Sequence, residues 1–261
     1  AQGARRHVDR VGQIRLGHVQ HEPIEFAVGE GTARAEEGIA GARPHLDATL
    51  ALLEGLGQAG WPQPARFVYA SSIAVYGESL PAQVDESTPA APALTYGTHK
   101  LAGELLVADA SRRGWVQGLS LRLPGVVARP GDGAGLMSAF MSQVFWRVAR
   151  GEPYAVPVRE DGRAWWLSVQ ACAANLAHAA TVDPAALRPT RSYPMPALWL
   201  SVGEVVQSLA RRFGPQAARV LRYEPQPLVQ QLFAEYPPLV TPQARVGAAT
   251  RQLLPPGDAA T

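Results

Sequence analysis

The amino-acid sequence predicts an α/β fold in which a mostly parallel sheet lies beside a small irregular lobe. Short apolar runs rich in Val, Phe, Tyr and Leu alternate with segments of helical periodicity, the pattern of strand–helix–strand units. Prolines crowd the chain after residue 184, and such segments favour irregular structure. We therefore expect residues 44–261 to form the folded unit, with the small lobe at about 151–261. Residues 1–43 show little periodicity, and we expect an atypical segment there, disordered or unrelated to the rest.

Each element is expected from a local pattern. Helices are expected where apolar residues recur every three or four positions, at 45–56, 96–113, about 136–150, 168–181 and 202–213. Strands are expected at the short apolar runs, at 66–70, 117–123, a pair within about 153–167, 198–200 and about 218–223. Gly114 follows the second helix in the position of a C-terminal cap, and Ser168 precedes the fourth as an N-cap. Among the first 43 residues only 24–28 resembles a short strand.

Composition and charge exclude several classes of function. Hydrophobic residues make up 47% of the chain, yet no run approaches the roughly 18 apolar residues of a membrane span. The net charge of +2 is too small to favour nucleic acid as a partner. A single cysteine, Cys172, leaves no internal disulfide and fits a reducing compartment. Since no export leader is evident, we expect a cytoplasmic protein that binds neither membrane nor nucleic acid.

Lysine usage points to one residue. Of the 24 Lys and Arg residues, only Lys100 is lysine. A position that keeps lysine in such an arginine-rich chain is expected to need an ammonium group and not a guanidinium. An incidental surface lysine is the alternative, and the neighbouring residues decide against it.

Tyr96 and Lys100 begin a predicted helix and lie one turn apart on the same face. About 24 residues earlier, a predicted strand ends in Ser71 and Ser72. A phenol ordinarily titrates near 10, so we expect the ammonium of Lys100 to lower the pKa of Tyr96. A strand-end hydroxyl can hold a substrate alcohol while the tyrosine takes its proton. A core tyrosine beside a surface lysine is the alternative, which the serine pair at this spacing disfavours.

Three strings carry a resemblance to a known family: FVYASSIAVYG (67–77), YGTHKLAGE (96–104) and LRLPGVVARPG (121–131). With them, the chain resembles the extended short-chain dehydrogenases/reductases of the NAD-dependent epimerase/dehydratase family. The third string, RAWWLS (163–168) and Ala174-Asn175-Leu176 are similar to the D-erythronate dehydrogenase branch. The resemblance covers about 45–255 and implies a Rossmann-like sheet whose small C-terminal lobe binds the substrate.

This resemblance implies roles for particular residues. Tyr96 is the implied proton acceptor, and Lys100 its partner that also holds the nicotinamide ribose. Ser72 is the implied hydroxyl donor to the substrate, with Ser71 as a near alternative that also lies toward the cofactor. Arg129 is implied as an anion or substrate contact, and a solvated loop arginine is an equal alternative. The implied contacts along the nicotinamide are Leu123, Pro124 and Gly125.

The same resemblance implies the cofactor and partners. NAD is the expected cofactor, with NADP left open, and the expected substrate is a small sugar or sugar acid. A homodimer is implied through the Tyr96 helix and the helix before it. No metal is expected, because His18 and His21 are the only suggestive pair and no third ligand is spaced to complete a site. Cys172 lies in an apolar helical run, which indicates buried packing and not a nucleophile.

The sequence departs from the family where the cofactor phosphates should bind. The family begins with a strand, a Gly-x-x-Gly-x-x-Gly turn and a helix, in which the glycines let the backbone reach the pyrophosphate. Here the nearest imitations are Gly29-x-Gly31 and Gly38-x-x-Gly41, and neither completes the pattern. We therefore expect the Rossmann-like sheet to be incomplete in its N-terminal half.

Three functions remain open. The first is an NAD-dependent oxidoreductase that oxidises a secondary alcohol of a small, D-erythronate-like sugar acid. The second is a nucleotide-sugar epimerase or dehydratase that uses the same tyrosine and lysine. The third is a non-catalytic remnant that lacks the cofactor glycine loop. Fold analogy alone does not choose among them.

Overall fold

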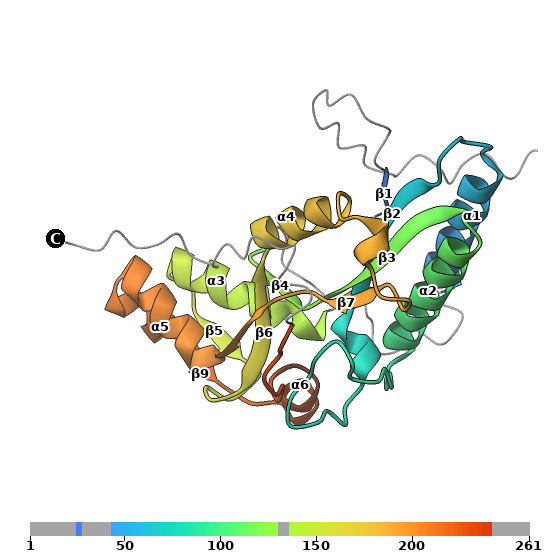
Figure 1. Cartoon of the computed structure of the whole chain (residues 1–261). Coiled ribbons are helices and arrows are strands. Elements are labelled where there is room, and N and C mark those ends of the chain that lie inside the picture. The colour runs from blue at the N-terminus through green and yellow to red at the C-terminus, as the bar shows by residue number, and fades with distance from the viewer. Residues whose placement is uncertain (1–24, 28–42, 130–135, 242–261) are drawn as a thin grey trace, which may run out of the picture.

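The computed structural model describes residues 25–27, 43–129 and 136–241, which form two lobes side by side (Figure 1). The strand expected at 24–28 is present as β1 (Glu25–Ala27). Gly29, Gly31, Gly38 and Gly41, like His18 and His21, lie outside the described residues.

A parallel sheet forms the first lobe. Its strand order is β1-β2-β3-β7, with β2 (Ala65–Ser72) and β3 (Val116–Leu123) at the centre and the short β7 (Ser192–Pro194) beside β3. All neighbouring pairs are parallel, and the register sets Ser72 opposite Leu123. The carboxyl ends of the two central strands therefore coincide at one edge of the sheet.

Helices cover both faces of this sheet (Figure 1). The helices α1 (Arg43–Gln58) and α2 (Thr95–Arg112) lie side by side on one face, and α4 (Val169–Ala179) lies on the other. Side chains alternate along β2 in agreement with this layering. Phe67 and Tyr69 pack in the cluster with α1 and α2, whereas Val68 packs in the cluster with α4. The predicted Rossmann-like layering of helix, parallel sheet and helix is confirmed.

The second lobe contains two small sheets. One holds β4 (Gly125–Val127), β6 (Arg163–Ser168) and β8 (Leu198–Ser201), in which β6 runs parallel to β4 and antiparallel to β8. The other pairs β5 (Tyr154–Val156) with β9 (Leu221–Tyr223). The two strands expected within 153–167 are therefore present, but our pairing of one with the other is wrong. Residues 157–162 carry the chain from one sheet to the other, so each strand finds partners distant in sequence.

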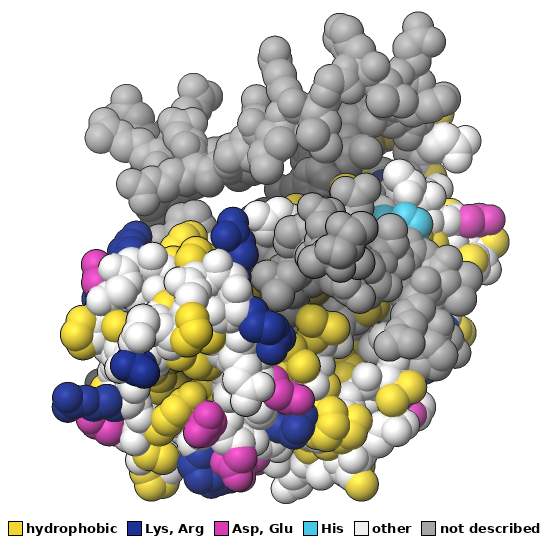
Figure 2. Space-filling model, turned by 90° about the vertical axis from the view of Figure 1, so that its left-hand side faces the viewer, with side chains coloured by type: hydrophobic (Ala, Val, Ile, Leu, Met, Phe, Trp, Pro, Cys, Tyr) yellow, Lys and Arg dark blue, Asp and Glu magenta, His cyan; other side chains and the backbone are white. Residues whose placement is uncertain are grey.

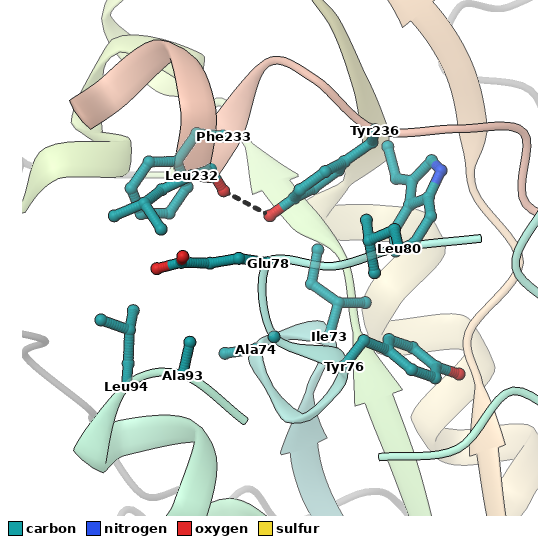
Figure 3. Close-up of a pocket in the computed structure, with 12 residues that line it drawn as sticks. Ile73, Ala74, Tyr76, Glu78, Leu80, Ala93, Leu94, Leu232, Phe233 and Tyr236 are labelled. Carbon is teal, nitrogen blue, oxygen red and sulfur yellow. Dashed lines mark hydrogen bonds between the residues drawn. The ribbon is translucent and has the colours of Figure 1, made fainter. Parts of the chain in front are cut away.

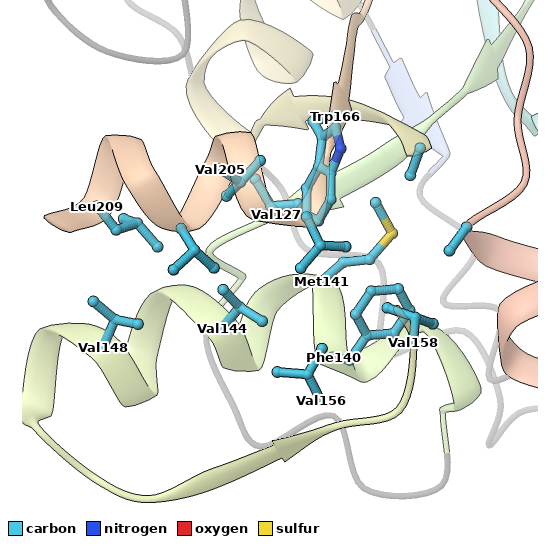
Figure 4. Packing of buried hydrophobic residues seen from close by; sticks show 14 of the residues in the cluster. Val127, Phe140, Met141, Val144, Val148, Val156, Val158, Trp166, Val205 and Leu209 are labelled. Atoms are coloured by element: carbon cyan, nitrogen blue, oxygen red, sulfur yellow. The ribbon is translucent and has the colours of Figure 1, made fainter. Parts of the chain in front are cut away.

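Two facing helices enclose the core of the second lobe (Figure 4). The helices are α3 (Phe140–Arg150) and α5 (Val202–Phe213), and valines from both meet around Trp166. Ser201 and Glu204 form a capping box at the start of α5, which satisfies free amides of its first turn. Val127 and α3 belong to this core, so the second lobe includes residues that precede position 151 in the sequence.

The remaining helical elements are short. They are η1 (Ile73–Tyr76), η2 (Met137–Ala139), η3 (Pro184–Ala186), η4 (Pro215–Val220) and α6 (Pro227–Phe233). Gly114 ends α2 with a positive φ of 75°, and Ser168 caps α4 through the amide of Ala171, both as predicted. Among the described helices, none has the length and apolar character needed to cross a membrane.

The face of the second lobe shows dispersed charges (Figure 2). Arginine and carboxylate side chains lie interspersed there with apolar ones and do not gather into a patch of one sign. Several arginines of this lobe are paired with carboxylates, as in Arg147 with Glu152 and Arg163 with Glu204. Exposed pairs of this kind contribute little to stability, about 0–1 kcal/mol each.

Two glycines let α2 lie very close to the sheet and to η1. A Cβ atom at Gly97 would overlap the backbone carbonyl of Ala74, and one at Gly103 would overlap the hydroxyl of Tyr69. The obstacle at Gly97 is backbone, which cannot turn aside as a side chain can. Any larger residue at this position must therefore displace the first turn of α2.

We predict that Gly97→Ala lowers the stability of the protein, whereas Gly55→Ala in α1 does not. The alanine methyl group at position 97 has no space, and overpacking of this kind costs about 1–3 kcal/mol. A Cβ atom at Gly55 meets nothing within 4 Å, so alanine there should be neutral or stabilise the helix by about 0.5–1 kcal/mol. Thermal unfolding of the two variants provides the comparison. Equal melting temperatures would contradict the close approach of α2.

Candidate active site

The candidate site lies at the carboxyl ends of β2 and β3, where open α/β sheets bind their ligands. Strand β2 ends at Ser72, and η1 turns the chain away from the sheet directly after it. Helix α2 begins one residue before Tyr96 and packs on both strands. The fold thus brings the serine pair and the Tyr96–Lys100 turn together from segments more than 20 residues apart.

Ser72 is the serine that meets Tyr96. Its hydroxyl lies near enough to the phenol of Tyr96 to lower the pKa of the tyrosine, because a neighbouring hydroxyl favours the ionised form. The Ser72 Oγ atom also accepts a hydrogen bond of 3.2 Å from the amide of Ala74 as the N-cap of η1. The backbone turn after β2 therefore holds this hydroxyl in place.

Ser71 faces the opposite way. It is 2% exposed, and its Oγ atom donates a hydrogen bond of 2.5 Å to Glu104 Oε1 on α2. Neighbouring residues of a strand point to opposite faces, so only one of the two serines can approach Tyr96. The geometry gives no support to Ser71 as the alternative hydroxyl donor.

Lys100 is nearly buried against the end of β2. Its Nζ atom donates a hydrogen bond of 2.9 Å to the carbonyl oxygen of Ala70 and lies 5.1 Å from the ring centroid of Tyr69. The same atom lies 5.7 Å from the ring centroid of Tyr96. Burial lowers the pKa of Lys100, because a desolvated ammonium is less stable. An ammonium has three N–H donors, so two more can reach a ligand.

The pKa of Tyr96 shifts upward, which corrects the expected direction. Burial of the phenol raises the pKa, and the Ser72 hydrogen bond and the charge of Arg129 lower it by less. We expected the Lys100 ammonium to dominate. Instead the ammonium is directed at the carbonyl of Ala70, while Tyr96 is partly buried. Desolvation therefore outweighs the nearby positive charge in the chain without ligands.

Glu104 and Arg122 are site residues that our sequence reasoning missed. Arg122 on β3 forms a two-pronged ion pair with Glu104, at 2.9 Å from Nε to Oε1 and 2.8 Å from Nη2 to Oε2. Burial alone would lower the pKa of Arg122, but the hydrogen bonds and charge of Glu104 raise it. Two signals were available: Glu104 follows Lys100 by one helical turn, and Arg122 is the one charged residue of the strand expected at 117–123.

The other predicted residues lie at the end of β3 and in the segment that follows it. Arg129 follows β4 and acts on Tyr96 through its charge, while its carbonyl oxygen accepts a hydrogen bond of 2.9 Å from Trp146. Leu123 ends β3 and Gly125 begins β4, with Pro124 between them. A Cβ atom at Gly125 would meet Met141 and the carbonyl of Trp165, so the packing of β4 within the second lobe requires a glycine there.

A small pocket adjoins the site between the two lobes (Figure 3). Its cavity volume is about 40 Å³, and its walls include Ile73 and Ala74 after the serines and Leu94 before Tyr96. Phe233 and Tyr236 close it from the second lobe. The hydroxyl of Tyr236 donates to the carbonyl of Leu232 at 2.8 Å, so the aromatic wall offers little free polarity. Glu78 brings the one carboxylate in the lining.

Other candidate chemistry is not supported by the described part of the chain. In residues 43–129 and 136–241, no three His, Cys, Asp or Glu side chains gather as a metal site would require. Cys172 is buried, and burial raises its pKa to about 11, so its thiol stays protonated at neutral pH. Trp165 and Trp166 are both buried.

The parallel sheet and the Ser72–Tyr96–Lys100 arrangement at its carboxyl edge define a short-chain dehydrogenase-type protein. The chain belongs to the NAD dependent epimerase/dehydratase family, whose model matches residues 22–184. From local sequence patterns alone we expected the folded unit to begin at residue 44. The family match begins earlier, at residue 22, and includes β1.

Curated relatives narrow the resemblance. The chain is 35% identical over 211 residues to a D-erythronate dehydrogenase of Cupriavidus necator, covering 81% of this chain and 64% of the relative. It is 32% identical over 172 residues to a D-erythronate dehydrogenase of Haemophilus influenzae, covering 66% of this chain and 55% of the relative. The chain thus spans less than two thirds of the length of these relatives.

A solved structure agrees with the fold. The nucleoside-diphosphate-sugar epimerase from Agrobacterium tumefaciens matches with a TM-score of 0.77 and 31% identity. The match covers 87% of this chain and 67% of that one. The predicted Rossmann-like, mostly parallel fold is confirmed by this likeness.

NAD is the cofactor that the family description names, and the described residues fit the nicotinamide end of such a cofactor. The Lys100 ammonium has donors left for ribose hydroxyls, and Lys100 is nearly buried at the sheet edge where nucleotides bind. Tyr96 and the turn at Pro124 border the same edge. The glycines considered for the pyrophosphate are outside the described residues.

We predict that Lys100 titrates below the ordinary lysine value of 10.5. Burial disfavours its charged form, and its one carbonyl partner does not offset this. Since Lys100 is the only lysine of the sequence, isotope-labelled lysine gives a single Cε signal whose pH titration reads this group directly. The urea-unfolded chain is the reference. A midpoint at or above that of the unfolded chain would show that the ammonium is solvated.

Proposed function

We propose that this chain carries the catalytic part of an NAD-dependent oxidoreductase that oxidises a secondary alcohol of a small, D-erythronate-like sugar acid. The observation that carries the proposal is the convergence of three groups at the end of β2: the Ser72 hydroxyl held by the turn after the strand, the phenol of Tyr96, and the buried ammonium of Lys100, which lies 5.7 Å from the Tyr96 ring centroid. The two D-erythronate dehydrogenases at 32% and 35% identity support the substrate class. The proposal thus combines an arrangement suited to alcohol oxidation with relatives named for a four-carbon sugar acid.

The chain's own residues divide the work. Ser72 hydrogen-bonds the substrate alcohol beside the phenol, and Tyr96 takes the alcohol proton at its hydroxyl oxygen. Lys100, anchored on the carbonyl of Ala70, supplies positive charge and donors for a ribose. NAD, when bound, accepts the hydride and supplies a cationic ring that favours the ionised tyrosine. Arg129 places a positive charge near Tyr96, where it can attract the carboxylate of a sugar acid.

The pocket beside the site favours a small substrate end. A volume of about 40 Å³ holds a group such as a hydroxymethyl, because one water needs about 10–15 Å³ by the same measure. Its walls are largely apolar and its carboxylate, Glu78, repels another carboxylate. We therefore propose that the acid end of the substrate lies toward Arg129 and the uncharged end toward this pocket.

A second candidate is a nucleotide-sugar epimerase, which the likeness to the Agrobacterium tumefaciens structure favours. Both reactions begin with proton removal by a tyrosine, so the site geometry alone serves either. They differ in outcome, because an NAD-dependent dehydrogenase releases reduced cofactor and an epimerase releases none.

We expect the protein to reduce NAD⁺ in the presence of a four- or five-carbon sugar acid, and Tyr96→Phe to lower the rate by about 10²–10⁴-fold. Phenylalanine fills the same space but cannot take the proton. The wild-type rate should rise with pH, because burial raises the pKa of Tyr96 and the base form grows as pH increases. Formation of NADH is the measurement, and Tyr223→Phe on β9 is the matched control.

The same assay separates the alternatives. Conversion of a nucleotide sugar without net NADH would favour the epimerase. A folded protein that binds neither NAD⁺ nor NADH in a direct titration would be a non-catalytic remnant, and the enzyme proposal would be withdrawn.

We also propose that the chain forms a homodimer through α1 and α2. Three leucines on these helices are exposed in the single chain: Leu50 at 39%, Leu52 at 37% and Leu105 at 65%. Leu50 and Leu52 point to different sides of α1, so Leu105, the most exposed of the three, is the leucine that we expect a second copy to cover.

We expect Leu105→Arg to convert the dimer to a monomer, since an arginine in the centre of an apolar interface loses water without gaining a partner. Leu228→Arg on α6, where the leucine is 54% exposed, is the control that should leave the dimer intact. Light scattering during gel filtration gives the mass of each variant. A wild-type mass of one chain would contradict the proposal.

A further inference from the structure

Ser71, which the proposed mechanism does not use, is part of a buried network that joins three segments of the site. Glu104 on α2 accepts hydrogen bonds from Ser71 on β2 and from Arg122 on β3. Glu104 is 3% exposed and Arg122 is 8% exposed. One carboxylate therefore holds together the carboxyl ends of two strands and the helix that carries Tyr96 and Lys100.

Ser71 lies directly before the serine that meets Tyr96. Residues on one side of β2 face α2, as Phe67 and Tyr69 do, and Ser71 continues that row. Ser72 then necessarily leaves the strand from the other side. A rotation of the strand end that moves the Ser71 hydroxyl away from Glu104 also moves the Ser72 hydroxyl.

Arg122 keeps Glu104 from turning away. Its guanidinium holds both carboxylate oxygens and lies 4.9 Å from the ring centroid of Tyr76, which belongs to η1. The planar fork of arginine fits a carboxylate in one orientation. Glu104 is thus presented to Ser71 in a fixed position, next to the turn that Ser72 caps.

We propose that Ser71, held by Glu104 and Arg122, is a positioning residue that sets the Ser72 hydroxyl on the phenol of Tyr96. This role rests on the proposed function, because only an active enzyme would use that hydroxyl in a reaction. The position of the Ser72 hydroxyl beside Tyr96 can nevertheless be tested in protein that is not turning over substrate. The other groups that face Tyr96 are Lys100 on its own helix, Tyr69 from β2 and Arg129 after β4. Among the described residues the hydroxyl of Ser71 donates to Glu104 and to none of these three, so we expect a change at Ser71 to reach Tyr96 through Ser72.

The test compares Ser71→Ala with Ser71→Thr and Ser120→Ala. Alanine removes the hydroxyl but leaves the ion pair of Glu104 and Arg122, and threonine restores a hydroxyl. Ser120 is an equally buried serine on β3 whose Oγ atom has no hydrogen-bond partner in the structure, so its loss controls for a buried change. If the alanine variant is unstable, Ser71→Cys keeps the volume with only a weak donor and is measured in its place.

The first readout is the ionisation of Tyr96 in protein with isotope-labelled tyrosine rings. The Tyr96 signal is identified by its loss in Tyr96→Phe. In Ser71→Ala we expect this signal to begin its shift at a higher pH than in wild type, because a hydrogen bond that favours the phenolate is lost. Ser71→Thr and Ser120→Ala should follow wild type. An unchanged titration in Ser71→Ala, or an equal change in Ser120→Ala, would overturn the proposal.

The second readout is the split between kcat and KM. Ser71→Ala should lower kcat about tenfold or more with the KM for NAD⁺ unchanged, since misplacement of a catalytic group slows the chemical step. Loss of cofactor affinity together with kcat would indicate a general loosening and would count against a positioning role. If wild type forms no NADH from any sugar acid, the proposed function fails, and the tyrosine titration still decides on Ser71.

Discussion

The close approach of α2 to the end of β2 is the constraint on which the site depends. Gly97 and Gly103 remove the side chains that would keep the helix away from η1 and from Tyr69. Only at this distance can Lys100 reach the carbonyl of Ala70 and the phenol of Tyr96 reach Ser72. The three groups come from two segments, and their mutual geometry is set by how far apart the helix and strand lie.

This proximity has an electrostatic consequence, because it buries charged groups. Lys100 has no carboxylate partner among its described contacts, and burial makes its ammonium less stable. Glu104 and Arg122 instead neutralise one another. Separating such a buried pair leaves an unpaired charge inside the protein, which typically costs about 3–5 kcal/mol. The pair therefore holds the helix against the sheet mainly because its separation is unfavourable, and less because the pair itself adds net stability. The site thus combines an ammonium destabilised by burial, on Lys100, with the Glu104–Arg122 ion pair one helical turn away.

The second lobe completes the surroundings of the site. Gly125 lets β4 pass against Met141 and Trp165, and α6 and the segment after it bring Phe233 and Tyr236 to a pocket lined also by η1. The resulting pocket is small and apolar, with Glu78 on one side, while Arg129 provides positive charge near Tyr96. An elongated substrate with one charged end would meet different chemistry at its two ends.

The sequence by itself determined the types of most elements and the candidate residues for the chemistry. Tyr96, Lys100 and Ser72 were recognisable because their spacing is local: one helical turn in one case, the end of an apolar strand in the other. The tertiary structure alone decided which strand pairs with which, as β5 with β9 shows, and that Ser71 belongs to Glu104 and not to Tyr96. It also reversed the expected pKa direction of Tyr96. The reason is the same each time: pairing, burial and desolvation depend on residues distant along the chain, and no local pattern contains them.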